Sequence, residues 1–295
     1  MPETPQIRWP LLDQRVKAQV WVKHENHTSI GTFKIRGALF YIAELRRKAP
    51  EVEGVIAATR GNFGQSVAFA AVNGGLRTVI VVARNNSKEK NAAMRALGAQ
   101  VIQFGRDFQE ALEYAEDLAR ETQLHFVDSF NLELVQGVAS YGLELFRSVP
   151  NLDFVYVPIG LGSGICGTIA ARNALGSKTK IIGVVPSGAP AYALSFQARK
   201  PVSTATVNTI ADGMACRVPI TVCSGVGGLL AGTAMPAPCY GGSLSPQPIY
   251  APIPAAKTLT VQLHRLGSPL QDAAVAHLCQ LLTDSETLFR PLTSA

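Results

Sequence analysis

Residues 54–83 read GVIAATRGNFGQSVAFAAVNGGLRTVIVVA, and this stretch alone indicates the fold class. It begins with an apolar, β-branched run at 54–59, continues with a helical pattern that ends at Gly74 and Gly75, and closes with a second apolar run at 77–83. Both runs are apolar throughout and do not alternate with polar residues. Strands of this kind are buried on both faces, so we predict parallel strands joined by a covering helix.

The same alternation of strand and helix repeats along the chain after this stretch. The pattern predicts further strands at 100–105, 124–129, 153–160 and 178–187, and further helices at 87–99, 108–123, 132–149 and 163–176. Ser87 is the expected N-cap of the first of these helices. The chain is therefore predicted to be an α/β protein with two open parallel sheets, each covered by helices on both faces.

The composition describes a globular protein: 295 residues, of which 47% are hydrophobic and 16% charged. The net charge of +6 comes from basic residues that lie beside acids, which indicates solvated helix faces and no nucleic-acid partner. The first ten residues lack the pattern of a secretory signal, and no apolar run reaches the roughly 18 residues of a membrane span. Five cysteines show no metal-binding spacing, so we expect reduced thiols in a cytoplasmic protein.

Two segments, one around a lysine and one rich in glycine, contain residues suited to catalysis and to binding an anion. In TSIGTFKIRGALFYI (28–42), Lys34 follows a small-residue turn and precedes an amphipathic helix. In VPIGLGSGICG (157–167), Gly160, Gly162 and Gly164 lie between a strand and a helix, where unpaired backbone amides can bind an anion. A tight turn without a ligand is the alternative for this loop.

A nucleotide is the rival ligand for the glycine loop. A dinucleotide site needs an acid about 20 residues further on, at the end of the next strand, and KIIGVVPSG (180–188) contains none. The chain also lacks a GxxxxGK[ST] motif for a nucleoside triphosphate. A phosphate loop combined with a lysine amine points instead to pyridoxal phosphate, whose phosphate needs backbone donors and whose aldehyde needs an amine.

Four ordered motifs between residues 10 and 219 resemble those of the fold-type II pyridoxal-phosphate enzymes, the tryptophan synthase β-like superfamily. KHENHTSIGTFKIRGA (23–38) resembles their lysine motif, ATRGNFGQSVAFAA (58–71) their asparagine loop and PIGLGSGICG (158–167) their phosphate loop. TIADGMACRVP (209–219) and the stretch at 87–111 look like the threonine/serine dehydratase branch. The resemblance implies a lyase that deaminates a β-hydroxy amino acid to a 2-oxo acid and ammonia by β-elimination.

The resemblance also implies an organisation and a set of roles. A small α/β domain would span 36–146, a large cofactor-binding domain would combine 1–35 with 147–295, and the protein would be a homodimer. Lys34 would form the Schiff base and remove the Cα proton, Phe33 would flank the cofactor ring, and Asn62 would hydrogen-bond the ring hydroxyl. The remaining roles are phosphate binding by Gly160, Leu161, Gly162, Ser163 and Gly164, and substrate carboxylate binding by the backbone around Thr59, Gly61, Asn62 and Phe63.

Each of these residues has a plainer alternative: Phe33 and Phe63 as core residues, Asn62 and Ser163 as helix N-caps. The chain also departs from the family. Phe63 stands where a histidine is usual, and Arg60 stands where serine racemases carry a serine. Arg60 makes racemisation less favoured and suits a second substrate carboxylate, so a hydroxyaspartate dehydratase-like enzyme is an alternative. Val185 and Ala191 replace the metal-binding acids of related enzymes, so we expect no metal site.

The character of the sequence changes after Pro219. Nine of the 18 prolines and only three of the 21 acids lie in residues 219–295. Residues 234–257 are too rich in proline for a regular strand or helix, and only 268–284 reads as a helix. We therefore expect 220–295 to be divergent or frameshift-derived and poorly ordered, and to lack two strands of the large domain. Two rivals follow: a catalytically impaired homologue that binds the cofactor, and a nucleotide-binding module.

Overall fold

The stretch at 54–83 folds as predicted into β3 (Gly54–Ala58), α3 (Asn62–Asn73) and β4 (Arg77–Val82). These elements belong to a computed structural model that describes residues 1–219, 221–224, 228–231 and 258–263. The chain divides into two compact units. Unit 1 comprises His27–Ser140 together with Met1, and unit 2 comprises Pro2–Asn26 and Tyr141–Ala295.

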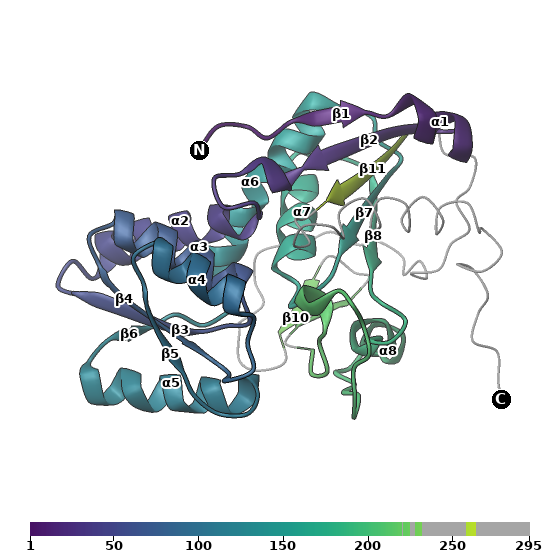
Figure 1. Cartoon of the computed structure of the whole chain (residues 1–295). Helices are drawn as coiled ribbons and strands as arrows, with labels where there is room; N and C mark the ends of the chain where they lie inside the picture. Colours follow the sequence, from purple (N-terminus) through teal and green to yellow (C-terminus); the bar gives the residue numbers. More distant parts are fainter. Residues whose placement is uncertain (220, 225–227, 232–257, 264–295) are drawn as a thin grey trace. The chain divides into compact units, whose positions relative to one another are not determined.

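Unit 1 is built on a four-stranded parallel sheet in the order β5-β4-β3-β6, with β5 (Gln100–Gln103) and β6 (His125–Phe126) at its edges. Successive residues of β3 point to opposite faces: Val55 and Ala57 into one core, Ile56 and Ala58 into the other. Helices α2 (Lys34–Lys48), α3 and α4 (Lys88–Ala96) cover the first face, and α5 (Phe108–Thr122) covers the second (Figure 1). This is the predicted sheet with helices on both faces.

Helix α6 (Leu132–Ser148) belongs to unit 1 in its first half and to unit 2 in its second half. The observed boundaries at 26/27 and 140/141 therefore differ from the small domain predicted at 36–146. In the second half of α6, the Glu144 carboxylate accepts a hydrogen bond of 2.6 Å from Nζ of Lys23, which is only 1% exposed. This buried ion pair ties the end of α6 to unit 2. The cofactor-binding role expected for the larger unit stays a prediction.

Unit 2 contains a five-stranded sheet in the order β1-β2-β11-β7-β8. It is parallel, as predicted, except at one edge, where β1 (Gln6–Arg8) pairs antiparallel with β2 (Gln19–His24). The other strands are β7 (Phe154–Pro158), β8 (Lys180–Val184) and β11 (Thr258–Leu263). Unit 2 also holds α1 (Pro10–Val16), α7 (Ser163–Ala174), α8 (Ala191–Ala198) and the short helices η1 (Glu25–His27, whose last residue falls in unit 1) and η2 (Asp212–Met214).

Three strands lie after Pro219, where the sequence pattern predicts none. β9 (Thr221–Ser224) pairs antiparallel with β10 (Gly228–Ala231), and β11 inserts in parallel between β2 and β7. The tail was expected to leave the large domain without two of its strands, but the TLTVQL segment at 258–263 supplies one, which pairs with both β2 and β7. Residues 234–257 and the helix predicted at 268–284 lie outside the described residues.

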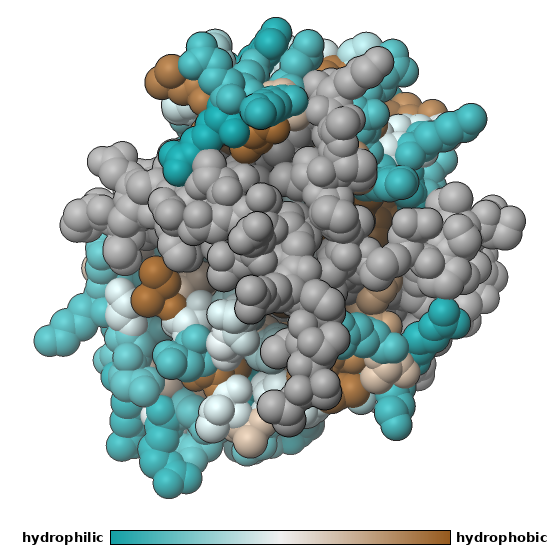
Figure 2. Space-filling view, turned by 90° about the vertical axis from the view of Figure 1, so that its right-hand side faces the viewer, coloured by the Kyte–Doolittle hydropathy of each residue, from teal (hydrophilic) through white to brown (hydrophobic). Residues whose placement is uncertain are grey.

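Two exposed arginines of unit 1 pair with acids close by in the sequence. Arg47 pairs with Glu44 at 2.7 Å and Arg106 with Glu110 at 2.5 Å, as expected for solvated faces. In Figure 2, hydrophilic side chains project from much of the described surface, with hydrophobic ones in small separate groups. Among the described residues, no helix combines the length and apolar character that a membrane crossing requires.

Unit 1 contains a titratable pair that makes its stability depend on pH. The Tyr41 hydroxyl lies 2.6 Å from Nε2 of His125. Burial, with Glu133 and Asp128 nearby, raises the pKa of Tyr41 to about 12, so its hydroxyl stays protonated. Burial lowers the pKa of His125. The folded state therefore favours the neutral ring. The contribution of His125 to the free energy of unfolding is fully present above about pH 6.5 and is lost as the pH falls below that value.

We predict that His125→Gln, whose amide can donate to or accept from the Tyr41 hydroxyl but cannot titrate, flattens the loss of stability between about pH 7 and 5. The measurement is the melting temperature of both proteins across this range. Equal pH dependence in the wild type and the variant would show that another group causes the acid destabilisation.

Candidate active site

The turn before Lys34 is fixed by its own hydrogen bonds. The Thr28 hydroxyl accepts from the Thr32 amide at 2.8 Å and donates to the Thr32 carbonyl at 3.0 Å, while the Gly31 amide donates to the Thr28 carbonyl at 3.0 Å. Gly31 adopts a φ of 71°, which favours glycine. Lys34 is then the first residue of α2, so its backbone position is set by a closed turn on one side and a helix on the other.

Helix α2 is itself held tightly within unit 1. The Arg36 side chain is 5% exposed and donates to the Ser140 hydroxyl at 3.1 Å. A Cβ on Gly37 would lie only 2.7 Å from the Leu134 carbonyl oxygen, so the backbones of α2 and α6 approach closely at this point. The half-buried side chain of Lys34 places Nζ 4.3 Å from the ring centroid of Phe33, which is 7% exposed. The amine therefore lies against the face of the preceding aromatic ring.

The asparagine loop follows β3 and leads into α3, whose N-cap is Gly61. The Thr59 hydroxyl accepts from the amides of Gly61 and Gly64, at 3.0 and 3.1 Å, and the Thr59 amide donates to the Val81 carbonyl at 3.1 Å. Thr59 and Gly61 thus use their amides inside the protein, contrary to the predicted carboxylate-binding role. The amides of Asn62 and Phe63 precede the first intrahelical bond, donated by Gln65, and can still bind an anion.

Helix capping and core packing were the plainer alternatives for these residues. Asn62 is the first helical residue and no side-chain cap is formed, so its N-cap alternative is wrong. Phe63 is 9% exposed and belongs to the core cluster that includes residues of α2 and α4, as its core alternative expects. Phe33 is also buried, at 7% exposed, and its place beside the cofactor ring stays a prediction. Arg60 is exposed on the loop. No acidic residue lies in the first turn of α3 to repel a carboxylate.

The glycine loop in unit 2 connects β7 to α7. Gly162 is the N-cap with a φ of 102°, no side chain caps the helix, and the Cys166 amide makes the first helical bond to the Gly162 carbonyl at 3.0 Å. The N-cap alternative for Ser163 is therefore wrong. Four amides precede this bond and lack an intrahelical partner: Gly162, Ser163, Gly164 and Ile165. Behind the loop, a Cβ on Gly160 would lie 2.4 Å from the Gly213 carbonyl oxygen.

These features fit a phosphate. The first turn of α7 carries no acidic side chain, and the loop backbone packs so closely on η2 that only glycine is accommodated at position 160. Unpaired amides and the positive end of the helix dipole together favour a dianion. Within the described part of the chain, no three side chains of His, Cys, Asp or Glu cluster closely enough to bind a metal ion.

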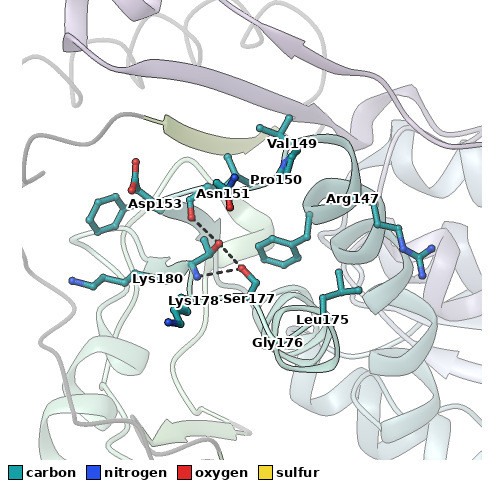
Figure 3. Close-up of a pocket in the computed structure, with 14 residues that line it drawn as sticks. Arg147, Val149, Pro150, Asn151, Asp153, Leu175, Gly176, Ser177, Lys178 and Lys180 are labelled. Carbon is teal, nitrogen blue, oxygen red and sulfur yellow. Dashed lines mark hydrogen bonds between the residues drawn. The ribbon is translucent and has the colours of Figure 1, made fainter.

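A separate cavity of about 830 Å³ lies in unit 2 at the amino ends of β7 and β8 (Figure 3). Its polar groups bond to one another: the Thr179 hydroxyl donates to the Leu152 carbonyl at 2.7 Å. Figure 3 shows the basic ends of Arg147 and Lys180 pointing in opposite directions. Ligands of parallel α/β sheets bind at the carboxyl ends of the strands, where 59–63 and 160–164 lie. This cavity is therefore not the predicted site.

A phosphate-bearing aldehyde cofactor needs an amine and a set of backbone donors, and the chain offers both: the lysine at the start of α2 and the amides at the start of α7 that lack an intrahelical partner. The chain belongs to the family of pyridoxal-phosphate dependent enzymes, whose family model matches residues 2–226. It is 35% identical over 210 residues to an L-threonine ammonia-lyase of Thermotoga maritima. It is also 35% identical over 218 residues to a catabolic L-threonine dehydratase of Staphylococcus aureus.

A solved structure has the same fold. The processed form of threonine deaminase isoform 2 from Solanum lycopersicum aligns with a TM-score of 0.70 and 31% identity, covering 74% of this chain and 60% of that one. The match to the Thermotoga protein covers 71% of this chain and 52% of the relative, and the match to the Staphylococcus protein covers 73% and 63%. The chain therefore spans about half to two thirds of the length of these relatives. The suspected superfamily and its dehydratase branch are confirmed, and the nucleotide-binding alternative is not supported.

Proposed function

We propose that this chain is a pyridoxal-phosphate dependent ammonia-lyase that converts threonine or serine to a 2-oxo acid and ammonia. The observation that carries the proposal is the half-buried amine of Lys34, fixed at the start of α2 by the turn at 28–32. The names of the threonine ammonia-lyase and dehydratase relatives support this reaction and substrate class.

The roles proposed for the residues follow from their chemistry. Pyridoxal phosphate, when bound, supplies an electron sink that stabilises negative charge at the substrate Cα. Lys34 is the attachment point, and its released amine removes the Cα proton. The amides of Asn62 and Phe63 bind the substrate carboxylate, and those of 162–165 bind the phosphate. The β-hydroxyl leaves as water, and a second water molecule then releases ammonia. Threonine therefore yields 2-oxobutyrate and ammonia, and the water lost in the first step equals the water taken up in the second.

The test is release of 2-oxo acid by the purified chain with added pyridoxal phosphate. We expect turnover of threonine and serine, and a smaller rate with 3-hydroxyaspartate, whose second carboxylate Arg60 would bind. A chain that binds the cofactor but releases no 2-oxo acid from any of the three would be the catalytically impaired homologue. Preference for 3-hydroxyaspartate would replace the proposed substrate class.

We also propose that the protein works as a homodimer in the cytoplasm. The proposal rests on the family resemblance and on the surface pairs of unit 1, which indicate a face exposed to water. Light scattering on the purified chain, with and without cofactor, measures the assembly directly. A monomer in both conditions would overturn the proposed dimer.

A further inference from the structure

Two buried tyrosines from different helices of unit 2 hold the carbonyl groups of the glycine loop. The Tyr141 hydroxyl, on α6, donates to the Gly164 carbonyl at 2.7 Å and lies 2.8 Å from the Thr168 hydroxyl. The Tyr192 hydroxyl, on α8, donates to the Leu161 carbonyl at 2.8 Å. Tyr141 is 0% exposed and Tyr192 is 6% exposed, so these bonds are shielded from water. The loop is thus fixed near both of its ends.

Each tyrosine acts on a peptide group whose opposite end is one of the four amides that lack an intrahelical partner. The carbonyl of Gly164 shares its peptide plane with the amide of Ile165, and the carbonyl of Leu161 shares its plane with the amide of Gly162. A hydroxyl that donates to the carbonyl restrains the orientation of this plane, and at Gly164 the Thr168 hydroxyl donates to the same carbonyl at 2.9 Å. Such a donor also polarises the peptide, which makes the attached N–H a stronger donor. The two bonds therefore act on the first and last of the four amides.

We propose that Tyr141 and Tyr192 are positioning residues for the phosphate group of the cofactor. They orient and polarise the Ile165 and Gly162 amides so that both point at a phosphate monoester. The proposal rests on the proposed function, because that function assigns the phosphate to this loop. It adds that two side chains that do not contact the ligand raise the affinity for it, because they orient the backbone amides that bind the phosphate.

The competing explanation is that the two hydroxyls merely stabilise the fold. The chain offers a matched control in Tyr156, on strand β7 that leads into the same loop. Its buried hydroxyl has no hydrogen-bond partner among the described residues, and burial raises its pKa to about 12. Tyr156→Phe therefore removes a hydroxyl from the same unit without removing a bond to the loop.

The experiment compares two ligands on the full chain: pyridoxal phosphate, and pyridoxal, which has the same aldehyde and no phosphate. Cofactor-free protein is titrated with each ligand, and binding is followed by absorbance. Loss of one hydrogen bond should weaken binding of pyridoxal phosphate about three- to tenfold in Tyr141→Phe and in Tyr192→Phe. Pyridoxal affinity should stay within about twofold in both, and Tyr156→Phe should change neither.

The outcomes separate the two explanations. Equal weakening of both ligands in the tyrosine variants, or unchanged affinity for pyridoxal phosphate, overturns the positioning role. Melting temperatures of the cofactor-free proteins show whether a variant folds, and if Tyr141→Phe does not fold, Tyr192→Phe tests the loop from its other end. A wild-type chain that binds neither ligand would remove the proposed function itself. That result differs from the case in which the wild type binds both ligands and the tyrosine variants show no phosphate-dependent loss, which overturns the positioning role alone.

Discussion

Replacing Lys34 by alanine is expected to abolish the absorbance band of the attached cofactor and to lower turnover at least about 10³-fold. The variant loses both the amine that attaches the cofactor and the base that removes the Cα proton. Alanine is a strong helix former and Lys34 begins α2, so the helix should remain intact. Absorbance spectra with added pyridoxal phosphate, followed by rates of 2-oxo acid release, measure both effects.

Lys48 provides the control for this variant, because it lies at the other end of the same helix. It forms exposed ion pairs with Glu133 at 3.0 Å and Glu44 at 3.7 Å, which contribute at most about 1 kcal/mol. Lys48→Ala should therefore keep the absorbance band and the activity. Trapping the attached cofactor by borohydride reduction and mapping the peptide should identify Lys34 in the wild type. Survival of the band in Lys34→Ala would mean that another lysine is the attachment point.

Sequence reasoning predicts the two loops between strand and helix where the structure has them, while their role in binding stays a prediction. The order of strand, loop and helix shows where amides fall at a helix start, and this predicted the loops at 59–63 and 160–164. It does not show which amides are already used. The amides of Thr59 and Gly61 donate to Val81 and to the Thr59 hydroxyl, contacts set by the folded sheet and turn.

The tyrosine bonds to the glycine loop could not be predicted either. Tyr141 lies 23 residues from Gly164 and Tyr192 lies 31 residues from Leu161. A tyrosine in a helical pattern reads as a core residue, and Tyr141 is indeed fully buried. Only the packing of α6 and α8 around the loop determines where each hydroxyl points.

The fold was predictable wherever hydrophobic periodicity is local. The elements between 54 and 176 follow the predicted pattern, including Ser87, which caps α4 by accepting from the Lys90 amide. β11 was missed because its TLTVQL sequence follows a long proline-rich stretch and has no predicted partner helix before it. Its pairing with β2 and β7 joins residues more than one hundred positions apart. The β-branched residues Thr258, Thr260 and Val261 were the available signal.

Replacing Gly160 by alanine is expected to weaken binding of pyridoxal phosphate about thirtyfold. The new Cβ would lie 2.4 Å from the Gly213 carbonyl oxygen, a distance that real Cβ contacts essentially never show. The oxygen belongs to the backbone and a Cβ is bonded directly to Cα, so the loop or η2 must move. Overpacking of this kind costs about 2 kcal/mol, which corresponds to about thirtyfold in affinity if the displaced amides no longer face the phosphate. Titration of the cofactor-free variant with pyridoxal phosphate measures the loss.

Gly213 itself provides the matched control. It supplies the carbonyl on the other side of the same contact, yet a Cβ built on Gly213 meets no atom of the described residues within 4 Å. Gly213→Ala should therefore keep the affinity for pyridoxal phosphate within about twofold. If Gly160→Ala also bound normally, the loop would tolerate displacement and its backbone amides would not be the phosphate donors. If both variants lost affinity equally, η2 would contact the ligand directly, and the effect could not be assigned to the close approach of the two backbones.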